Sequence, residues 1–299
     1  MNKSVLVVYY SQSGQLKKIA ENFTAPFLEK KMEIEWLQVK PKNDFPFPWS
    51  SKAFFEVMPE SVLGIPAELL PAEFKQSSYD LIVFAYQPWY LSPSIPATSI
   101  LKNPEFKKRL LNTPVITLIG SRNMWINAQE RVRKLLKEAD ANLIGNIVLT
   151  DKHTNLISAI TIQYWMFTGK KDKLWGIFPK PGISDEDINS VHLFGAKTSE
   201  ALLNGNLAGL QKKLTEMRAV EVNSNLMFIE ERAPKLFSMW ANVIIKKNNR
   251  NFWLQLFKYY LMFVLFIVSP IVLLINMLFS KPFSLKQIRK KKNYYSGIN

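Results

Sequence analysis

Cysteine is absent from the 299 residues of this chain, and histidine occurs only twice. The lack of cysteine excludes disulfides, thiol nucleophiles and cysteine-ligated metal sites, and leaves the redox compartment undetermined by thiols. No pair of carboxylates, metal-ligand cluster or nucleophile–base arrangement stands out. We therefore expect no metal site.

Acidic residues are missing from residues 232–299, which hold 12 of the 39 lysines and arginines. The other 27 basic residues are nearly balanced by 24 acidic ones, so most of the net charge of +15 belongs to the C-terminal end. The charge surrounds the most apolar segment of the chain. This placement favours attraction to anionic membrane lipids over binding of nucleic acid, with a solvated tail without function as the alternative.

The chain begins with a pattern typical of a strand, a loop and a helix. Residues 5–10 are apolar and rich in β-branched and aromatic side chains. In residues 15–31, apolar and polar side chains alternate with the period of a helix. Between them the loop is Ser11, Gln12, Ser13, Gly14 and Gln15. Two hydroxyls, a glycine and the unpaired N–H groups of a helix start suit a phosphate. An ordinary connection capped by Ser13 is the alternative.

Four further strands are expected, within residues 32–39 and at 79–86, 114–120 and 143–149. Helical patterns near 100–111 and from residue 127 separate the last three. Residues 40–78 are rich in proline and aromatic residues and should form a packed excursion, with a short helix near 51–58, that covers either a ligand or the sheet. Alternating strands and helices predict an α/β fold with a doubly wound parallel sheet.

This pattern resembles the flavodoxin-like family over about residues 3–150, with the last helix near 185–214. The resemblance implies a five-stranded flavodoxin-like sheet and FMN as the cofactor. The implied phosphate loop comprises Ser11, Gln12, Ser13, Gly14, Gln15 and Leu16. The loops that flank the isoalloxazine ring hold Gln87, Pro88, Trp89 and Tyr90, and Gly120, Ser121, Arg122, Asn123, Met124 and Trp125. The family usually has Thr or Ser where this chain has Leu16, so one phosphate hydroxyl is missing.

A narrower resemblance is to the aromatase component of dialkylresorcinol biosynthesis, as in aryl-polyene and flexirubin-type pathways. It rests on the chain length, residues 122–130 (RNMWINAQE), residues 151–171 (DKHTNLISAITIQYWMFTGKK) and the apolar, basic C-terminus. This resemblance implies a flavin-dependent dehydrogenation of a lipophilic cyclic diketone, with a ketosynthase as a partner. Two other hypotheses are a flavodoxin-like quinone or electron-transfer reductase and a non-catalytic membrane scaffold for a ketosynthase.

Residues 151–183 interrupt the flavodoxin-like domain, expected at 1–217, and leave the sheet beside the implied flavin loops. Their apolar side chains suit alkyl chains, or else pack on the core. His153 is a candidate general base with Asp151 to orient it, and Arg122 a candidate for binding an acidic group. A structural or exposed histidine and a surface ion pair are the alternatives.

Residues 259–279 carry no formal charge over 21 positions, enough to cross a membrane. We expect an amphipathic linker at 218–258, a membrane segment at 259–280 and a basic tail at 281–299, with the main domain in the cytoplasm because no secretory signal is present. A full crossing would place the basic tail outside, against the positive-inside bias. A monotopic or re-entrant hairpin is therefore our hypothesis, with a crossing kinked at Pro270 as the alternative.

Overall fold

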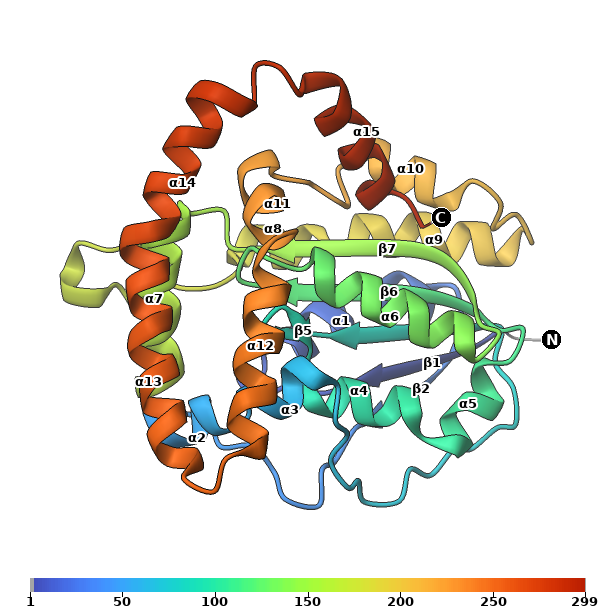
Figure 1. Ribbon diagram of the computed structural model, residues 1–299. Helices are drawn as coiled ribbons and strands as arrows, with labels where there is room; N and C mark the ends of the chain where they lie inside the picture. Colours follow the sequence, from blue (N-terminus) through green and yellow to red (C-terminus); the bar gives the residue numbers. More distant parts are fainter. Residues whose placement is uncertain (1–2, 299) are drawn as a thin grey trace.

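The computed structural model describes residues 3–298 and contains one five-stranded parallel sheet (Figure 1). Its strands are β1 (Ser4–Tyr9), β2 (Glu33–Gln38), β3 (Leu81–Tyr86), β6 (Pro114–Ser121) and β7 (Asn142–Thr150), in the order β2-β1-β3-β6-β7. This is the flavodoxin-like order, so the predicted fold class is confirmed. All six side chains of β3 are buried, as a central parallel strand covered on both faces requires.

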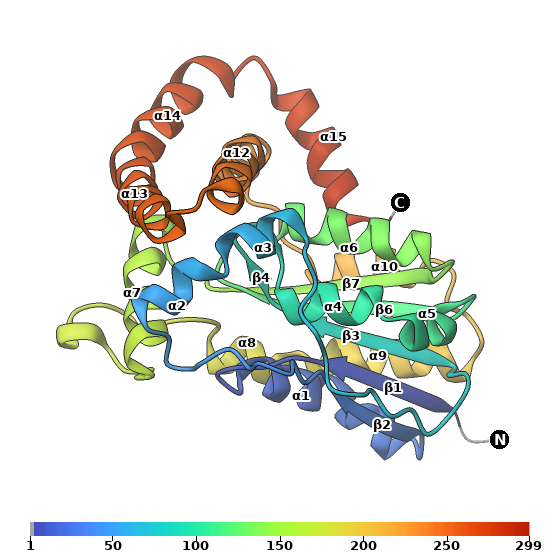
Figure 2. The same ribbon diagram turned by 60° about the horizontal axis from the view of Figure 1, so that its bottom comes forward.

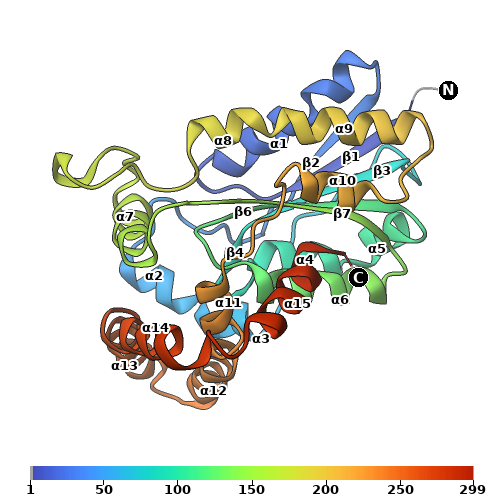
Figure 3. The ribbon, with the colours of Figure 1, turned by 90° about the horizontal axis from the view of Figure 1, so that it is seen from above.

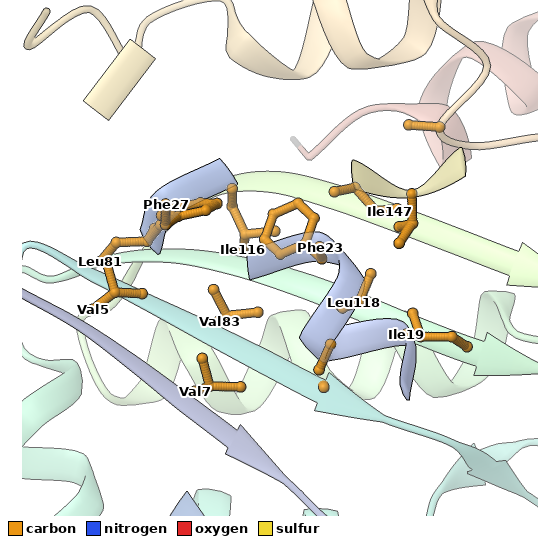
Figure 4. Packing of buried hydrophobic residues seen from close by; sticks show 14 of the residues in the cluster. Val5, Val7, Ile19, Phe23, Phe27, Leu81, Val83, Ile116, Leu118 and Ile147 are labelled. Carbon is orange, nitrogen blue, oxygen red and sulfur yellow. The ribbon is translucent and has the colours of Figure 1, made fainter. Parts of the chain in front are cut away.

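Helices cover both faces of the sheet (Figure 3). On one face lie α1 (Gln15–Glu29), α8 (Asp185–Ser190), α9 (His192–Leu203) and α10 (Leu210–Glu216), and Figure 4 shows Phe23 and Phe27 of α1 over the strands. On the other lie α4 (Ile95–Lys102), α5 (Pro104–Leu110) and α6 (Ile126–Glu138). The single helix expected near 185–214 is divided, and Gly205 and Gly209, both with positive φ, lie between α9 and α10.

The carboxyl ends of the strands face a second group of elements. The excursion after β2 contains α2 (Ser51–Glu56) and α3 (Met58–Leu63), and a two-stranded hairpin, β4 (Pro88–Trp89) and β5 (Ser92–Pro93), follows β3. The insertion after β7 contains α7 (Asn155–Thr168) and the short η1 (Leu174–Gly176). These elements lie at the edge of the sheet where open α/β folds bind ligands.

The C-terminal helices form an arch beside the domain (Figure 2). They are α11 (Ser224–Glu230), α12 (Ala233–Lys246), α13 (Arg250–Phe263), η2 (Val264–Val268), α14 (Ser269–Ile275), η3 (Asn276–Ser280) and α15 (Leu285–Ser296). The chain remains packed on the domain beyond residue 217, because Val220, Val222 and Met227 belong to the apolar core that the sheet forms with α4, α5 and α6.

Arg250–Phe279 is one continuous helix, and among residues 3–298 it is the one candidate membrane span by length and composition. Only 6% of its most apolar window is buried. Pro270 does not break it, since helical dihedrals continue through Ser269 and a π-helical turn, η2, directly precedes it. The wider π-helical turn lets the helix continue although Pro270 has no N–H to donate to the preceding turn.

Candidate functional site

A cavity of about 260 Å³ lies at the carboxyl edge of β1, β3 and β6. All three loops predicted for the cofactor contribute to its wall. The predicted residues that line it are Gln12, Ser13, Gln15, Leu16, Gln87, Pro88, Trp89, Tyr90, Gly120, Ser121 and Arg122. We call this space the ring cavity. Ligand sites of open α/β sheets occupy this position, where the strand order reverses between β1 and β3.

Five predicted residues lie outside the wall of the ring cavity. Ser11 accepts a hydrogen bond from the backbone N–H of Lys17 at 3.4 Å, and Gly14 is the N-cap of α1 with φ of 81°. Asn123 donates to Asn155 Oδ1 at 3.1 Å and thereby fixes its loop to α7. Trp125 is buried in the core, and Met124 lines a neighbouring cavity.

The start of α1 is suited to an anion. Its N-cap makes no side-chain capping bond, and its first turn contains no acidic residue. The first-turn N–H groups and the helix dipole therefore direct positive potential toward Ser13 and the ring cavity. Leu16, where the resemblance implied a hydroxyl, is buried in the core and also lines the cavity.

Lys171, from the insertion, reaches the same loop. Its Nζ donates to Gln15 Oε1 at 3.1 Å and to the carbonyl of Ile183 at 3.2 Å, and it lies 5.3 Å from the centre of the Trp165 ring. Burial is the main reason that the pKa of Lys171 is lowered. Gly182 completes the wall, since a Cβ there would meet Trp165 at 2.7 Å and Gln15 Oε1 at 2.9 Å.

Aromatic side chains from the excursion after β2 cover the ring cavity. Phe47, Trp49 and Phe54 line it, and the sequence indicated this role only through the proline- and aromatic-rich composition of residues 40–78. Trp89 meets Phe45 at 5.0 Å and Trp49 at 5.4 Å between ring centres, both nearly perpendicular. The indole of Trp89 is therefore fixed by its neighbours in preferred edge-to-face geometry.

The β4–β5 hairpin presents Tyr90 toward the C-terminal helices. Tyr90 and Leu91, its two central residues, have φ of 48° and 60°, a conformation that glycine normally supplies. The Tyr90 hydroxyl donates to the carbonyl of Phe54 at 2.6 Å, and its ring lies 6.5 Å from that of Phe257 in α13. Burial raises the pKa of Tyr90, so this hydroxyl stays protonated and acts as a donor.

A second cavity, of about 530 Å³, adjoins the ring cavity, and we call it the chain cavity. The two share wall residues Phe54, Pro88, Tyr90, Ser121, Arg122, Ile162 and Met166. The rest of the chain cavity is largely apolar and comes from α7, α12 and the long helix, including Phe167, Phe237, Leu261, Met262 and Leu265. The two cavities together can hold a planar ligand at the sheet edge and an apolar ligand beside it.

Arg122 is the charged side chain common to both cavities. One Nη donates to the carbonyl of Asn155 at 3.1 Å, which leaves other N–H donors of the guanidinium for a ligand. Burial lowers the pKa of Arg122 to about 10, against the opposing effects of Asp151 and Glu230. The side chain remains cationic at neutral pH, so it suits a carbonyl or enolate oxygen.

His153 and Asp151 do not come together as an acid–base pair at either cavity. The His153 side chain is exposed, and it is the backbone N–H of His153 that donates to Asp151 Oδ1, at 2.9 Å. Asp151 is 2% exposed, and neither residue lines the ring or chain cavity. The candidate base from the sequence is thus placed outside the site, because the chain turns away into α7 directly after β7.

Glu230, at the end of α11, caps the helix that follows the Arg122 loop. α6 has no side-chain cap of its own, and Glu230 Oε1 accepts from the backbone N–H of Asn127 at 2.9 Å. The residue is 1% exposed, and burial raises its pKa to about 8. Sequence reasoning missed this residue, since its partner lies 103 positions away.

Replacing Glu230 with glutamine is expected to change the pH dependence of stability. Because the folded pKa lies above the unfolded value of 4.5, wild-type stability falls as pH rises from about 5 to 8, by at most about 1.4 kcal/mol per pH unit. Glu230→Gln keeps the acceptor but does not titrate. The difference in Tm between variant and wild type should therefore increase up to pH 8 and then level off. A difference that does not vary with pH would contradict this assignment.

Comparisons with known proteins identify no family model that matches and no matching curated protein. Similar solved structures include a flavoprotein from Lactobacillus acidophilus in complex with FMN, with 21% identity, 49% of this chain and 93% of the other covered, and a TM-score of 0.40. A flavoprotein from Bacteroides eggerthii has 18% identity, coverage of 50% and 89%, and a TM-score of 0.39. Two-electron reduced flavodoxin from Megasphaera elsdenii has 13% identity, coverage of 50% and 86%, and a TM-score of 0.30.

Proposed function

We propose that this chain binds FMN in the ring cavity and acts as a flavin-dependent oxidoreductase on a lipophilic cyclic diketone at a membrane. In its specific form, the proposal is that a dialkyl cyclohexanedione is aromatised to a dialkylresorcinol. The observation that carries it is the shared wall of the two cavities, because an apolar chamber adjoins the ring cavity at the sheet edge. This arrangement suits a ring that reacts and an alkyl chain that anchors it.

The residues around the ring cavity fit FMN by their chemistry. Ser13 and the N–H groups of Gln15 and Leu16 at the start of α1 would hold the phosphate, with Lys171 beside Gln15 as the added cation. Trp49, Trp89 and Tyr90 supply aromatic surface for a planar ring system. Gly182 leaves room that any side chain would fill.

The proposed reaction removes one hydride and one proton from the diketone ring. FMN, when bound, supplies the hydride acceptor. Arg122 would hold a substrate oxygen and stabilise the negative charge of the enolate, with the proton passing to water. No histidine or carboxylate among residues 3–298 lines either cavity. A 1,3-diketone is acidic enough to enolise without such a base, so the proposed substrate matches the side chains present.

Anaerobic mixing tests this function. Protein loaded with oxidised FMN is mixed with a dialkyl cyclohexane-1,3-dione, and the expected result is bleaching of the flavin and formation of one dialkylresorcinol per flavin. Cyclohexane-1,3-dione without alkyl chains should react far more slowly, because it leaves the chain cavity empty. Bleaching by NAD(P)H with quinone turnover, and none by the diketone, would contradict the proposal in favour of a reductase.

Lys171→Gln is expected to weaken FMN binding about tenfold, the loss of one charge-assisted contact. Riboflavin, which lacks the phosphate, should bind the variant and the wild type equally. The matched control is Lys170→Gln, because Lys170 is the adjacent lysine and is exposed, whereas Lys171 is half-buried and bonded to Gln15. Titration of the apoprotein followed by flavin fluorescence measures both ligands. Equal losses for FMN and riboflavin would show that Lys171 does not act on the phosphate.

A further inference from the structure

The two ends of the long apolar helix are both attached to the α/β domain. At its start, Arg250 pairs with Glu60 at 2.7 Å and also donates to the carbonyl of Glu56. Leu254 and Phe257 are buried with Phe55, Met58 and Ala241 in one apolar cluster. The first two turns of the helix are therefore fixed to α2, α3 and α12.

After the helix, the chain returns to the domain through α15. Lys291 pairs with Glu231 at 2.7 Å, and the Tyr294 hydroxyl donates to Glu130 at 2.9 Å. Tyr295 packs on the apolar core that the sheet forms with α4, α5 and α6. Gln211 of α10 donates to the carbonyl of Ser296 at 2.8 Å. The end of the chain thus lies on the same domain as the start of the helix (Figure 2).

This return is incompatible with a helix that crosses a bilayer. A crossing would place Phe279 on the far side of the hydrocarbon core, about 30 Å from the membrane surface that faces the domain. Only the short connection between η3 and α15, followed by a helix of 12 residues or about 18 Å, leads from there to Ser296. That path would also carry the six basic residues of the tail back through hydrocarbon, at a cost of several kcal/mol each.

The outer face of the helix presents an apolar stripe. Its exposed members recur every three or four positions, as one face of a helix requires: Phe252, Leu256, Tyr259, Phe263, Ile267, Ile271, Leu274 and Leu278. Exposed lysines and arginines lie at both ends, at Lys246 and Lys247 and at Lys286, Arg289 and Lys290. An apolar stripe with cationic ends is complementary to one leaflet of an anionic bilayer.

We propose that the helix Arg250–Phe279 lies along one leaflet of an anionic membrane, with its outer stripe in the lipid and both ends on the domain side. Its inner face, including Leu261 and Leu265, lines the chain cavity. The same helix therefore separates lipid from that cavity. The proposal concerns attachment only and stands whether or not the chain binds a flavin.

Cysteine labelling tests this topology, since the natural chain contains no cysteine. Single variants Lys290→Cys in α15 and Ser77→Cys on the domain, both at exposed positions, are expressed in bacteria. Everted and right-side-out vesicles are then treated with a membrane-impermeant maleimide. Both variants should react in everted vesicles and neither in sealed right-side-out vesicles. Reaction of the Lys290→Cys variant from the side opposite to Ser77→Cys would overturn the proposal.

Vesicle binding tests the stripe itself. Ile271→Asp places a charge at a stripe position that is 53% exposed, and Ile65→Asp places the same charge on the domain at a position that is 37% exposed. The first change should reduce binding to vesicles with 30% phosphatidylserine at least about tenfold, and the second should not. Equal binding by the two variants would overturn the proposal, and self-association that Ile271→Asp abolishes without affecting vesicle binding would assign the stripe to a second copy instead.

Discussion

Ser13→Asp is expected to weaken FMN binding by at least about 100-fold. Ser13 is exposed, lines the ring cavity and precedes an α1 N-terminus that has no acidic residue. A carboxylate there would stand close to the phosphate of FMN. At an effective dielectric constant near 20, two unit charges about 5 Å apart repel by about 3 kcal/mol, which corresponds to a loss of more than 100-fold.

The same substitution should not destabilise the protein. An acidic side chain at a helix N-terminus stabilises the helix by about 0.3–1 kcal/mol, so the Tm of the Ser13→Asp apoprotein should equal or exceed that of wild type. Ser13→Asn is the matched neutral control and should retain FMN. Riboflavin should bind all three proteins alike. If Ser13→Asp bound FMN normally in a fluorescence titration, the phosphate would have to lie elsewhere.

Gly195→Ala is expected to cause the largest loss of stability, about 3 kcal/mol or more. Gly195 lies where α9 crosses α1, and a Cβ there would stand 1.9 Å from the backbone carbonyl oxygen of Phe23. Because the obstacle is backbone, no rotamer change relieves the clash, and the two helices must separate. Thermal unfolding in detergent should show a fall in Tm of roughly 10 °C.

Gly145→Ala is the matched control for this prediction. A Cβ at Gly145 would meet the side chain of Ile116 at 3.1 Å, and that side chain can move by a few tenths of an ångström. The expected loss is therefore below about 1.5 kcal/mol. A similar Tm for the two variants would show that α1 and α9 tolerate separation and that their close approach does not stabilise the fold.

The sheet and the loops at its carboxyl edge could be predicted because their signals are local. A buried strand such as Leu81–Tyr86 is a continuous apolar run, and the loop that follows each strand in a doubly wound fold has only one edge to occupy. Thus Ser13, Trp89 and Arg122 come together at the ring cavity although more than 100 positions separate the first from the last.

Other parts of the site depend on contacts that no local pattern encodes. Trp49 lines the ring cavity from the excursion, and Lys171 contacts the cavity residue Gln15 from the insertion. Only packing determines where such segments lie. The capping of α6 by Glu230 has the same origin, and so does the docking of Tyr294 on Glu130. His153, by contrast, was predicted for the site and lies outside it. It follows a strand end directly, yet the turn into α7 leaves it exposed.

The ring cavity as a flavin site is the central claim, and cofactor stoichiometry tests it most directly. The full chain is purified in detergent, denatured, and the released cofactor is identified and quantified by absorbance and mass spectrometry. We predict a yellow protein that releases close to one FMN per chain, or a colourless one that takes up one FMN per chain on titration. A colourless protein that takes up no FMN would contradict the account.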